Sequence, residues 1–427
     1  MLKINAKFKA VLNRTRYKNT LVQHQAKAQE ALASARMTST PSLIRSIRVL
    51  GATALLAIGL PLSAQAETLI PAAPELAASS WILMDAESGK ILAEHNADEK
   101  LPPASLTKMM TAYLVEHEID KGNLNPTDKV RISEKAWRAP GSRMFIREGT
   151  FVEVEKLLHG VIIQSGNDAS TALAEHLAGS ESSFADLMNQ FAQRLGMTNT
   201  HYMNATGLPA EGHHSTAHDL AILARHIIED YPDHYQIYSQ RYFTYNDIRQ
   251  ANRNRLLWRD NSVDGLKTGH TDEAGYCLVA SAKRNDMRLI SVVMGTKSDE
   301  ARTQESQKLL AYGFRYFDTR KLYEKYEPLN TSKVWSGAQD EVQLGLEHDL
   351  SVTIPRGREG DLKASLEIDP VIKAPVQAGQ SYGRLVIRLD DKEVAEKPLV
   401  ALQNVEQGGF FKRIWDSIVL FVMGLFN

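Results

Sequence analysis

Hydrophobic and polar positions change their period along the chain, which predicts where strands and helices lie. Two short apolar runs, 80–85 and 90–94, flank the turn Ala86-Glu87-Ser88-Gly89 and are typical of a β-hairpin. From Leu106 apolar residues recur at helical spacing, and the preceding Pro102-Pro103 favours a helix start. Helical periods are also expected over 156–165, 167–178, 183–195, 216–229 and 301–316, and strand-like runs over 262–268, 276–283 and 287–295.

Strand-like runs at both ends of this section, with helices between them, predict an α+β domain whose terminal strands join one sheet. Beyond residue 318 the pattern changes to short alternating runs separated by Gly, Pro and Asp, which indicate a small all-β domain. These runs cover 342–346, 350–354, 363–368, 383–389 and 393–402. We therefore expect a first domain over 67–318 and a β-rich domain over 319–406.

The first 66 residues have the pattern of a targeting segment. Two arginines precede an apolar stretch over 49–62, and Ala64-Gln65-Ala66 fits a small-x-small cleavage site. The basic extension before it is unusual for a signal peptide, so Met37 is our hypothesis for the true start, with a leader over 37–66. We expect export, with cleavage after Ala66.

The segment 407–427 has a different pattern. After Gly408-Gly409, aromatic and aliphatic residues recur over 410–427, while Lys412, Arg413 and Asp416 gather near one side. The uncharged stretch that follows is too short to cross a bilayer. We expect an amphipathic helix that lies in the surface of the cytoplasmic membrane; the alternative is a core helix of the β-rich domain.

Charge is distributed unevenly. Residues 1–66 hold ten Lys/Arg and one Asp/Glu, a net charge of +9, so the whole-chain charge of −1 leaves residues 67–427 at −10. An acidic mature chain without a basic stripe argues against a nucleic-acid partner. Cys277 is the single cysteine, which excludes an intramolecular disulfide, and its apolar surroundings favour a small buried side chain over a reactive thiol.

Three short motifs carry the candidate chemistry. Ser105 and Lys108 lie three residues apart and therefore side by side on a helix, although this tetrad alone is most often an ordinary first turn. Ser165-Gly166-Asn167 follows between two helical stretches, and Lys267-Thr268-Gly269 ends a strand-like run. Because the three motifs occur in order and in these contexts, we predict that Ser105 is a nucleophile and Lys108 its base.

Each of these residues can be given a physical role. Lys108 accepts a proton only when neutral, so its pKa must fall from about 10.4 by roughly three units. Burial and a second cation, for which Lys267 is the candidate, act in that direction. Ser165 can relay a proton to the leaving amine, and Asn167 can hold Lys108 and the substrate amide.

The strand motif is expected to bind the substrate. Lys267 and the hydroxyl of Thr268 would hold a carboxylate, and Gly269 lets the backbone approach closely. The backbone amides of Ser105 and His270 would form an oxyanion hole.

These motifs resemble the low-molecular-mass penicillin-binding proteins, the D-alanyl-D-alanine carboxypeptidases, of types five and six. The resemblance covers nearly all of residues 67–427 and includes PASLTKMM, QSGNDA, NRNRLLW, VDGLKTGHTDEAGY, RLISVVMG and TIPRG. It implies a penicillin-binding domain with an antiparallel sheet and helices, and removal of the terminal D-alanine from peptidoglycan pentapeptide stems through an acyl-Ser105 intermediate that β-lactams trap. By the same resemblance Arg302 would help to hold the terminal carboxylate, and no cofactor is expected.

The resemblance also implies residence at the periplasmic face of the cytoplasmic membrane. The segment 137–144 departs from the family, since it holds a single Ser142 where relatives often carry two serines.

Other functions remain as alternatives. A β-lactamase needs fast attack of water on the acyl-enzyme, and the glutamate loop of class A enzymes is missing before the Lys-Thr-Gly strand. A penicillin-sensing or cell-wall-binding module would keep the motifs without turnover. His213, His214 and His218 have metal-like spacing with Asp219, but 216–219 also has the pattern of a helix cap, and we expect no metal.

Overall fold

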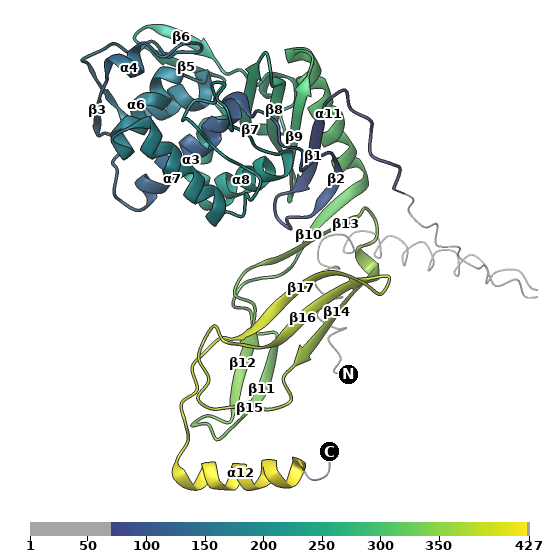
Figure 1. Cartoon of the computed structure of the whole chain (residues 1–427). Helices are drawn as coiled ribbons and strands as arrows, with labels where there is room; N and C mark the ends of the chain where they lie inside the picture. The colour runs from purple at the N-terminus through teal and green to yellow at the C-terminus, as the bar shows by residue number, and fades with distance from the viewer. Residues whose placement is uncertain (1–69, 425–427) are drawn as a thin grey trace, which may run out of the picture. The chain divides into compact units, whose positions relative to one another are not determined.

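The computed structural model describes residues 70–424 (Figure 1). The predicted leader and its cleavage site lie outside this range. The described residues group into two compact units, one made of 70–325 with 348–359 and the other of 326–347 with 360–424. Between residues 70 and 424 no helix has the length and apolar character needed to cross a bilayer.

The first unit is built on a five-stranded sheet with the order β2-β1-β9-β8-β7, in which all neighbours are antiparallel. Strands β1 (Ser80–Asp85) and β2 (Ile91–His95) come from its beginning. Strands β7 (Val263–Thr271), β8 (Gly275–Arg284) and β9 (Met287–Thr296) come from its end. The pairing of β1 with β9 confirms the predicted α+β arrangement, in which the terminal strands join one sheet.

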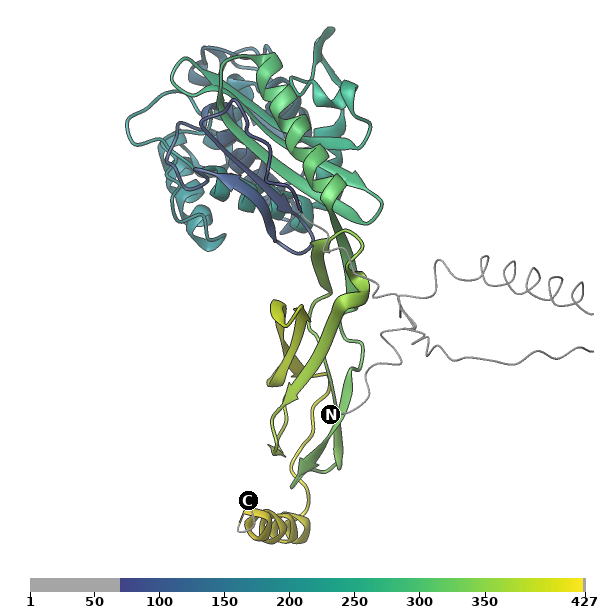
Figure 2. The ribbon, with the colours of Figure 1, turned by 90° about the vertical axis from the view of Figure 1, so that its right-hand side faces the viewer.

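Helices cover both faces of this sheet (Figures 1 and 2). One face carries α11 (Asp299–Tyr316), which packs on β8 and β9. The other face carries the helical region of α3 (Lys108–Asp120), α5 (Val154–His159), α6 (Asn167–Ala178), α7 (Glu181–Arg194) and α8 (Ala217–Asp230). The apolar spacing had predicted each of these helices, although α3 and α6 are buried on all sides over most of their length.

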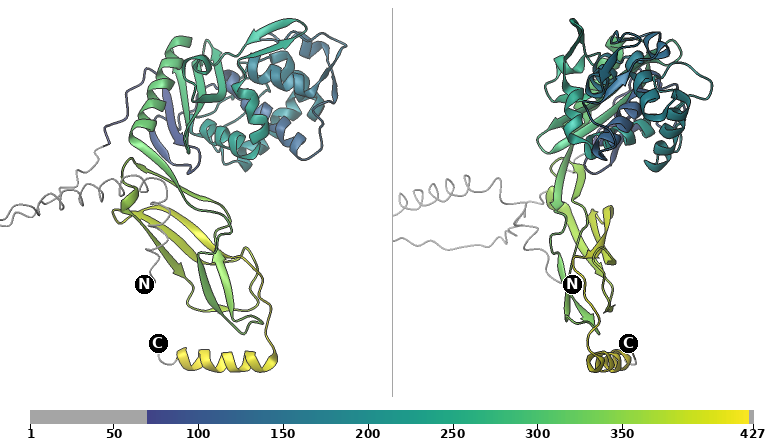
Figure 3. Two further views of the ribbon diagram at one scale, coloured as in Figure 1. Left: turned by 180° about the vertical axis from the view of Figure 1, so that it is seen from behind. Right: turned by 90° about the vertical axis from the view of Figure 1, so that its left-hand side faces the viewer.

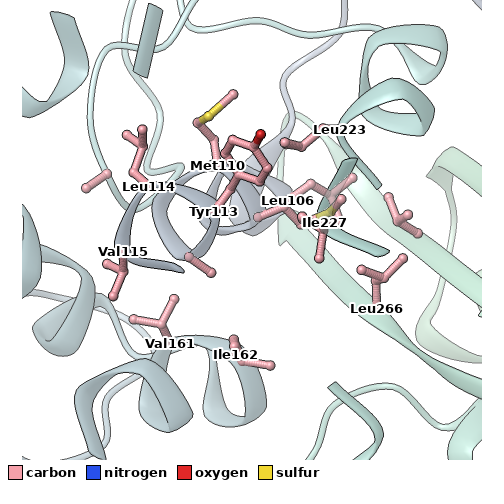
Figure 4. Packing of buried hydrophobic residues seen from close by; sticks show 14 of the residues in the cluster. Leu106, Met110, Tyr113, Leu114, Val115, Val161, Ile162, Leu223, Ile227 and Leu266 are labelled. Carbon is pink, nitrogen blue, oxygen red and sulfur yellow. The ribbon is translucent and has the colours of Figure 1, made fainter. Parts of the chain in front are cut away.

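The larger hydrophobic core surrounds α3 (Figure 4). Helix α3 is buried over most of its length, so the core holds the start of this helix and the turn before it in a fixed position. The labelled members of this core are Leu106, Met110, Tyr113, Leu114, Val115, Val161, Ile162, Leu223, Ile227 and Leu266.

Several short elements were not predicted from the sequence. The hairpin β5 (Tyr242–Tyr245) and β6 (Ile248–Ala251) leads to helix α10 (Leu256–Arg259). The helix expected over 156–165 continues α5 with a π-helical turn, Gly160–Gln164. The remaining short elements are β3 (Lys129–Arg131), α4 (Glu134–Trp137), β4 (Phe151–Glu153), α9 (Pro232–Tyr235) and the 3-10 turn Gln236–Ser239.

The second unit holds a six-stranded sheet with the order β14-β16-β17-β12-β11-β15 (Figure 3). Its strands are β11 (Asn330–Trp335), β12 (Glu341–Gly345), β14 (Leu362–Ile368), β15 (Ile372–Lys373), β16 (Ser381–Leu389) and β17 (Lys392–Ala401). The predicted run 350–354 forms β13 (Leu350–Pro355), which pairs with β10 (Phe317–Tyr323) as a separate ribbon. Helix α12 (Phe410–Gly424) follows the sheet.

Candidate active site

The candidate nucleophile Ser105 lies in a turn at the start of α3, which we call the nucleophile turn. Residues Ala104–Thr107 form a 3-10 turn after Pro103, and the α-helix begins at Lys108. Inside this turn the Lys108 Nζ donates to the Ser105 Oγ at 3.0 Å and also to the carbonyl of Thr206. Ser105 is half-buried whereas Lys108 is buried, so the hydroxyl is accessible while the amine is held away from water.

The environment of Lys108 favours its neutral form. The pKa of this amine is lowered to about 7, mainly by burial and in addition by the positive charge of Arg253, which takes the place expected for Lys267 as the second cation. The carboxylates of Asp168 and Glu181 act in the opposite direction. A large fraction of Lys108 is therefore neutral near pH 7 and able to take the proton of Ser105.

A second serine–lysine pair faces the first. The π-helical turn ends at Ser165, whose left-handed backbone starts the turn into α6. On β7 the Lys267 Nζ donates to the Ser165 Oγ at 2.8 Å. Burial lowers the pKa of Lys267 well below its usual value, and repulsion from Lys108 adds to this effect. The structure thus brings Ser105, Lys108, Ser165 and Lys267 together.

Asn167 lies at the first position of α6, next to Ser165. Its side-chain Nδ2 donates to the carbonyl of Pro140 at 2.6 Å, and its backbone N–H donates to the carbonyl of Ser142 at 2.7 Å. These bonds tie Asn167 to the segment 137–144, which departs from the family pattern. The expected role of Asn167 in holding Lys108 and a substrate amide stays a prediction.

The Lys-Thr-Gly strand passes close to the nucleophile turn. A Cβ on Gly269 would lie 2.9 Å from the carbonyl oxygen of Pro103, so glycine is required at this approach. Thr268 is buried, while His270 is exposed and its ring packs 3.9 Å from that of Tyr276. The strand therefore presents its backbone beside Ser105, as an oxyanion hole requires.

Arg302 supports this strand from α11. Its Nη1 donates to the carbonyls of Gly269 at 2.9 Å and Cys277 at 3.3 Å, and its Nη2 pairs with Asp299. These contacts connect α11 to the neighbouring strands β7 and β8 at the pair Gly269 and Cys277. The carboxylate-binding role that resemblance gives to Arg302 stays a prediction.

Sequence reasoning missed two residues of the site. Arg253 donates from its Nε to the carbonyl of Gln164 at 3.1 Å, and its charge lowers the pKa of both Lys108 and Lys267. In the sequence, Arg253 was marked only by its place in NRNRLLW, one of the stretches that carry the family resemblance. His213, considered earlier only as a metal ligand, places its Nε2 2.9 Å from the Thr107 Oγ1 inside the nucleophile turn.

A cavity of about 660 Å³ opens beside the nucleophile turn. Residues 102–104, which lead into the turn, form one wall. The loop from Gly207 to His214 forms another, and Thr271 with Glu273 extends the cavity along the end of β7. This space is large enough for several residues of a peptide. The candidate site therefore combines Ser105 hydrogen-bonded to Lys108, a second serine–lysine pair and, next to the turn, a cavity with room for several residues of a peptide.

Comparison with known proteins gives consistent matches. A D-alanyl-D-alanine carboxypeptidase family model, peptidase S11, matches residues 67–298, and the C-terminal domain of penicillin-binding protein 5 matches residues 317–407. The carboxypeptidase DacC of Escherichia coli K12 is 47% identical over 392 residues, which cover 90% of this chain and 97% of DacC. DacA of the same strain is 46% identical over 363 residues, 83% of this chain and 90% of DacA.

Solved structures agree with these relatives. Penicillin-binding protein 5 from Haemophilus influenzae superposes with a TM-score of 0.75 at 43% identity, covering 79% of this chain and 100% of that one. Penicillin-binding protein D2 from Listeria monocytogenes, solved in its ampicillin-bound form, has a TM-score of 0.53 at 33% identity and covers 57% of this chain and 100% of that one.

Proposed function

The chain belongs to the D-alanyl-D-alanine carboxypeptidase family, and from this premise we propose that Ser105 is its acylated nucleophile. The protein is a serine-type D-Ala-D-Ala carboxypeptidase. The observation that carries the proposal is the 3.0 Å hydrogen bond from the Lys108 Nζ to the Ser105 Oγ, formed by an amine whose pKa is lowered to about 7.

In the acylation step, neutral Lys108 removes the proton of Ser105 while the Oγ attacks the carbonyl carbon between the two D-alanines. The backbone amides of Ser105 and His270 receive the developing negative charge. The protonated Lys108 gives this proton to Ser165, which is hydrogen-bonded to Lys267, and Ser165 passes its own proton to the nitrogen of the departing D-alanine, so that the C–N bond breaks as a neutral amine leaves. Water then attacks the ester and releases the shortened peptide, and one proton of this water returns to the Oγ of Ser105.

The proposed substrate is the pentapeptide stem of peptidoglycan. Lys267 and Thr268 would bind the terminal carboxylate, and Asn167 and Arg302 would hold the peptide and the strand. The part of the stem before the cleaved bond would then extend past His270 into the cavity beside the nucleophile turn. A β-lactam would acylate the same Ser105, as expected for a ring that presents a strained amide to this nucleophile.

One experiment separates this proposal from its rivals. The protein and its Ser105→Ala variant are incubated with a diacetyl-Lys-D-Ala-D-Ala peptide and, separately, with penicillin. Release of D-alanine together with a long-lived penicillin adduct on the Ser105 peptide supports the proposal, and both are expected to vanish in the variant. Rapid penicillin hydrolysis without D-alanine release points to a β-lactamase, and neither activity points to a sensing or cell-wall-binding module.

We also propose that α12 holds the protein at a membrane surface. Asp416 accepts from the backbone N–H of Ser336, and Lys412 pairs with Asp340, so one side of α12 is attached to its own β-rich unit. The opposite side exposes large apolar residues, which favours an interfacial helix over a core helix. These exposed residues include Phe411, Ile414, Trp415, Ile418, Phe421 and Val422.

This location fits an exported enzyme. Together with a leader over 37–66, an interfacial α12 would place the protein at the periplasmic face of the cytoplasmic membrane. The domain boundaries that we propose are 1–66 for the extension and leader, 67–318 for the catalytic domain, 319–406 for the β-rich domain and 407–427 for the anchoring segment.

A further inference from the structure

A pair of exposed aromatic rings lies beside the active site. Tyr242 on β5 and Trp258 on α10 keep 44% and 39% of their surface exposed. Their ring centroids lie 5.9 Å apart at an interplanar angle of 80°. The Arg249 guanidinium lies 3.8 Å above the Tyr242 ring, and that of Arg241 lies 6.0 Å from the Trp258 ring. We call these four side chains the aromatic ledge.

The ledge is rigidly connected to the catalytic groups. Residues 252–254, which join its hairpin to α10, form one edge of the site. In that segment the Arg253 Nε donates to the carbonyl of Gln164, and the Asn254 Nδ2 donates to the carbonyl of Gly265 on β7 at 2.9 Å. Gln250 on β6 also donates from its Nε2 to the carbonyl of Arg143 at 3.0 Å. A polymer bound on the ledge would therefore lie on the side of the candidate site formed by Gln164 and Arg143.

The ledge carries positive charge that no carboxylate of the described residues balances. Arg241 and Arg249 form no ion pair within residues 70–424, and the same holds for nearby Arg143. By contrast, Arg255 and Arg259, on the other side of Trp258, pair with Asp299 and Glu300. Exposed rings flanked by free guanidinium groups suit a ligand that has flat apolar faces together with hydrogen-bond acceptors and negative charge.

We propose that the aromatic ledge binds the glycan strand of peptidoglycan, next to the stem on which the enzyme acts. The less polar face of an N-acetylated aminosugar can stack on Tyr242 and Trp258. The guanidinium groups of Arg241 and Arg249, which have no carboxylate partner among residues 70–424, can donate to its acetamido oxygens and to carboxylates of the attached peptide. This proposal rests on the proposed function, because it takes the polymer that carries the pentapeptide as the occupant.

A protein partner fits the ledge less well. A stable protein interface buries about 800 Å² on each partner, with charged residues depleted at its centre. Here two rings are framed by guanidinium groups and by the polar hairpin position Thr244, which is also exposed. A sugar chain needs only a narrow track of this composition.

The test compares polymeric and small substrates. The full chain and a Tyr242→Ala/Trp258→Ala variant are assayed for D-alanine release from isolated pentapeptide-rich peptidoglycan and from diacetyl-Lys-D-Ala-D-Ala. Binding of both proteins to insoluble peptidoglycan is measured in parallel by co-sedimentation. A Tyr242→Phe/Trp258→Phe variant keeps the rings, and Phe151→Ala removes an exposed aromatic from β4 as a matched control.

Loss of both rings is expected to weaken peptidoglycan binding and polymer turnover about tenfold, the size of one or two ring-stacking contacts. The kcat/KM on the small peptide should change less than about twofold, since neither ring touches the catalytic groups. The phenylalanine variant and Phe151→Ala should behave as the unsubstituted protein.

Several results would overturn the proposal. Equal losses on peptide and polymer would mean that the rings act on the fold or the catalytic groups, and unchanged polymer binding would mean that the ledge is not a glycan site. A dimer that the double variant abolishes, detected by sedimentation velocity, would assign the ledge to self-association instead. Absence of D-alanine release from either substrate would refute the proposed function, while co-sedimentation would still report on the ledge.

Discussion

At the residue scale, the protonation of Lys108 depends on the positive charge of Arg253. The proposed mechanism uses neutral Lys108 as the base, so kcat/KM should rise with pH through about 7. Because the charge of Arg253 lowers the pKa of Lys108, Arg253→Gln should raise that pKa and move the acidic limb of the profile to higher pH. At pH 7 the loss from this shift should stay below about tenfold, which corresponds to one pKa unit.

The measurement is kcat/KM on a small peptide substrate between pH 5 and 9. Arg259→Gln serves as the control, because Arg259 pairs with Glu300 at the surface and is not among the groups that shift the pKa of Lys108. An acidic limb that stays in place in the Arg253 variant would contradict this account.

Gly207 shows how closely the neighbouring loop approaches the nucleophile turn. Its backbone has a φ of +78°, and a Cβ at this position would lie 1.8 Å from the carbonyl oxygen of Ala104. Gly207→Ala should therefore displace the turn that carries Ser105 and slow acylation by penicillin about 100-fold or more, since displacements near 1 Å have effects of this size. Gly196→Ala, which also has a positive φ but no atom within 4 Å of its Cβ, is the matched control, and equal slowing in both variants would rule out the steric explanation.

The residues that could be predicted from the sequence are those whose spacing is local. Ser105 with Lys108, and Lys267 with Thr268 and Gly269, lie within short motifs. Arg253 could not be assigned in the same way, because its effect on Lys108 arises from folding that brings residues 145 positions apart together. His213 was considered only as a metal ligand, because the spacing of the histidines does not reveal its contact with Thr107.

At the element scale, Asp168 on α6 holds the segment that lies over the site. Its carboxylate accepts from the backbone N–H groups of Met144, Phe145 and Ile146 at 3.0, 2.9 and 3.3 Å. Asp168→Ala should leave these amides without an acceptor, and their hydrogen exchange should accelerate by more than about tenfold, as loss of roughly 1.4 kcal/mol per site implies. Mass-spectrometric exchange on peptides covering 140–148 tests this, with Asp186→Ala on α7 as control; unchanged exchange would show that other contacts hold the segment.

Glu116 is a buried acid inside α3. Between residues 70 and 424 neither of its carboxyl oxygens has a hydrogen-bond partner, and burial raises its pKa from 4.5 to about 8. The folded state therefore binds a proton that the unfolded state releases above pH 4.5. The stability that this proton provides is fully present below pH 4.5 and is lost as the pH rises through about 8.

Glu116→Gln should remove this dependence and stabilise the protein at pH 8 by an amount on the order of a few kcal/mol. The free energy of urea unfolding, measured at pH 5 and pH 8, gives the comparison, and Glu118→Gln on the same helix is the control. If the Glu116 variant lost as much stability between the two pH values as the unsubstituted protein, the buried acid would not be its source.

Helices were predicted more accurately than short strands for a physical reason. Helix α6 and the predicted range 167–178 coincide, because its apolar period and Gly179, which ends it, are both local signals. The hairpin β5–β6 was missed because each strand has only four residues and none of them is fully buried, so the apolar signal is weak. The pairing of β13 with β10, and not with the β-rich sheet, depends on contacts between residues about 30 positions apart.

At the scale of the whole molecule, the sheet order could be inferred from the sequence only in outline. Strand-like runs at the two ends of the first domain indicated one sheet, and the hairpins β1–β2, β7–β8 and β8–β9 follow from short connections. The central pairing of β1 with β9 joins segments about 200 residues apart and needs the three-dimensional fold. This closure places the nucleophile turn, which follows β2, against β7 and thereby creates the catalytic site.

The proposed membrane attachment concerns the whole molecule, and α12 makes it testable. Phe411 and Trp415 are 86% and 67% exposed and lie one turn apart on the apolar side of the helix. Replacing both by glutamate should weaken co-sedimentation with phosphatidylethanolamine/phosphatidylglycerol vesicles by more than about tenfold, because each ring would otherwise contribute about 1.5–3 kcal/mol on burial in the interface.

Ser417→Glu adds a single charge to the exposed side of the same helix without removing an apolar side chain, and it should retain most of the binding. Hydrolysis of the small peptide should be unchanged in both variants, since α12 belongs to the β-rich unit and the catalytic residues to the other. Vesicle binding that survives the double substitution would mean that another part of the chain attaches the protein. Equal loss in Ser417→Glu would point to general electrostatic repulsion, because insertion of the apolar side predicts that only the first variant is released.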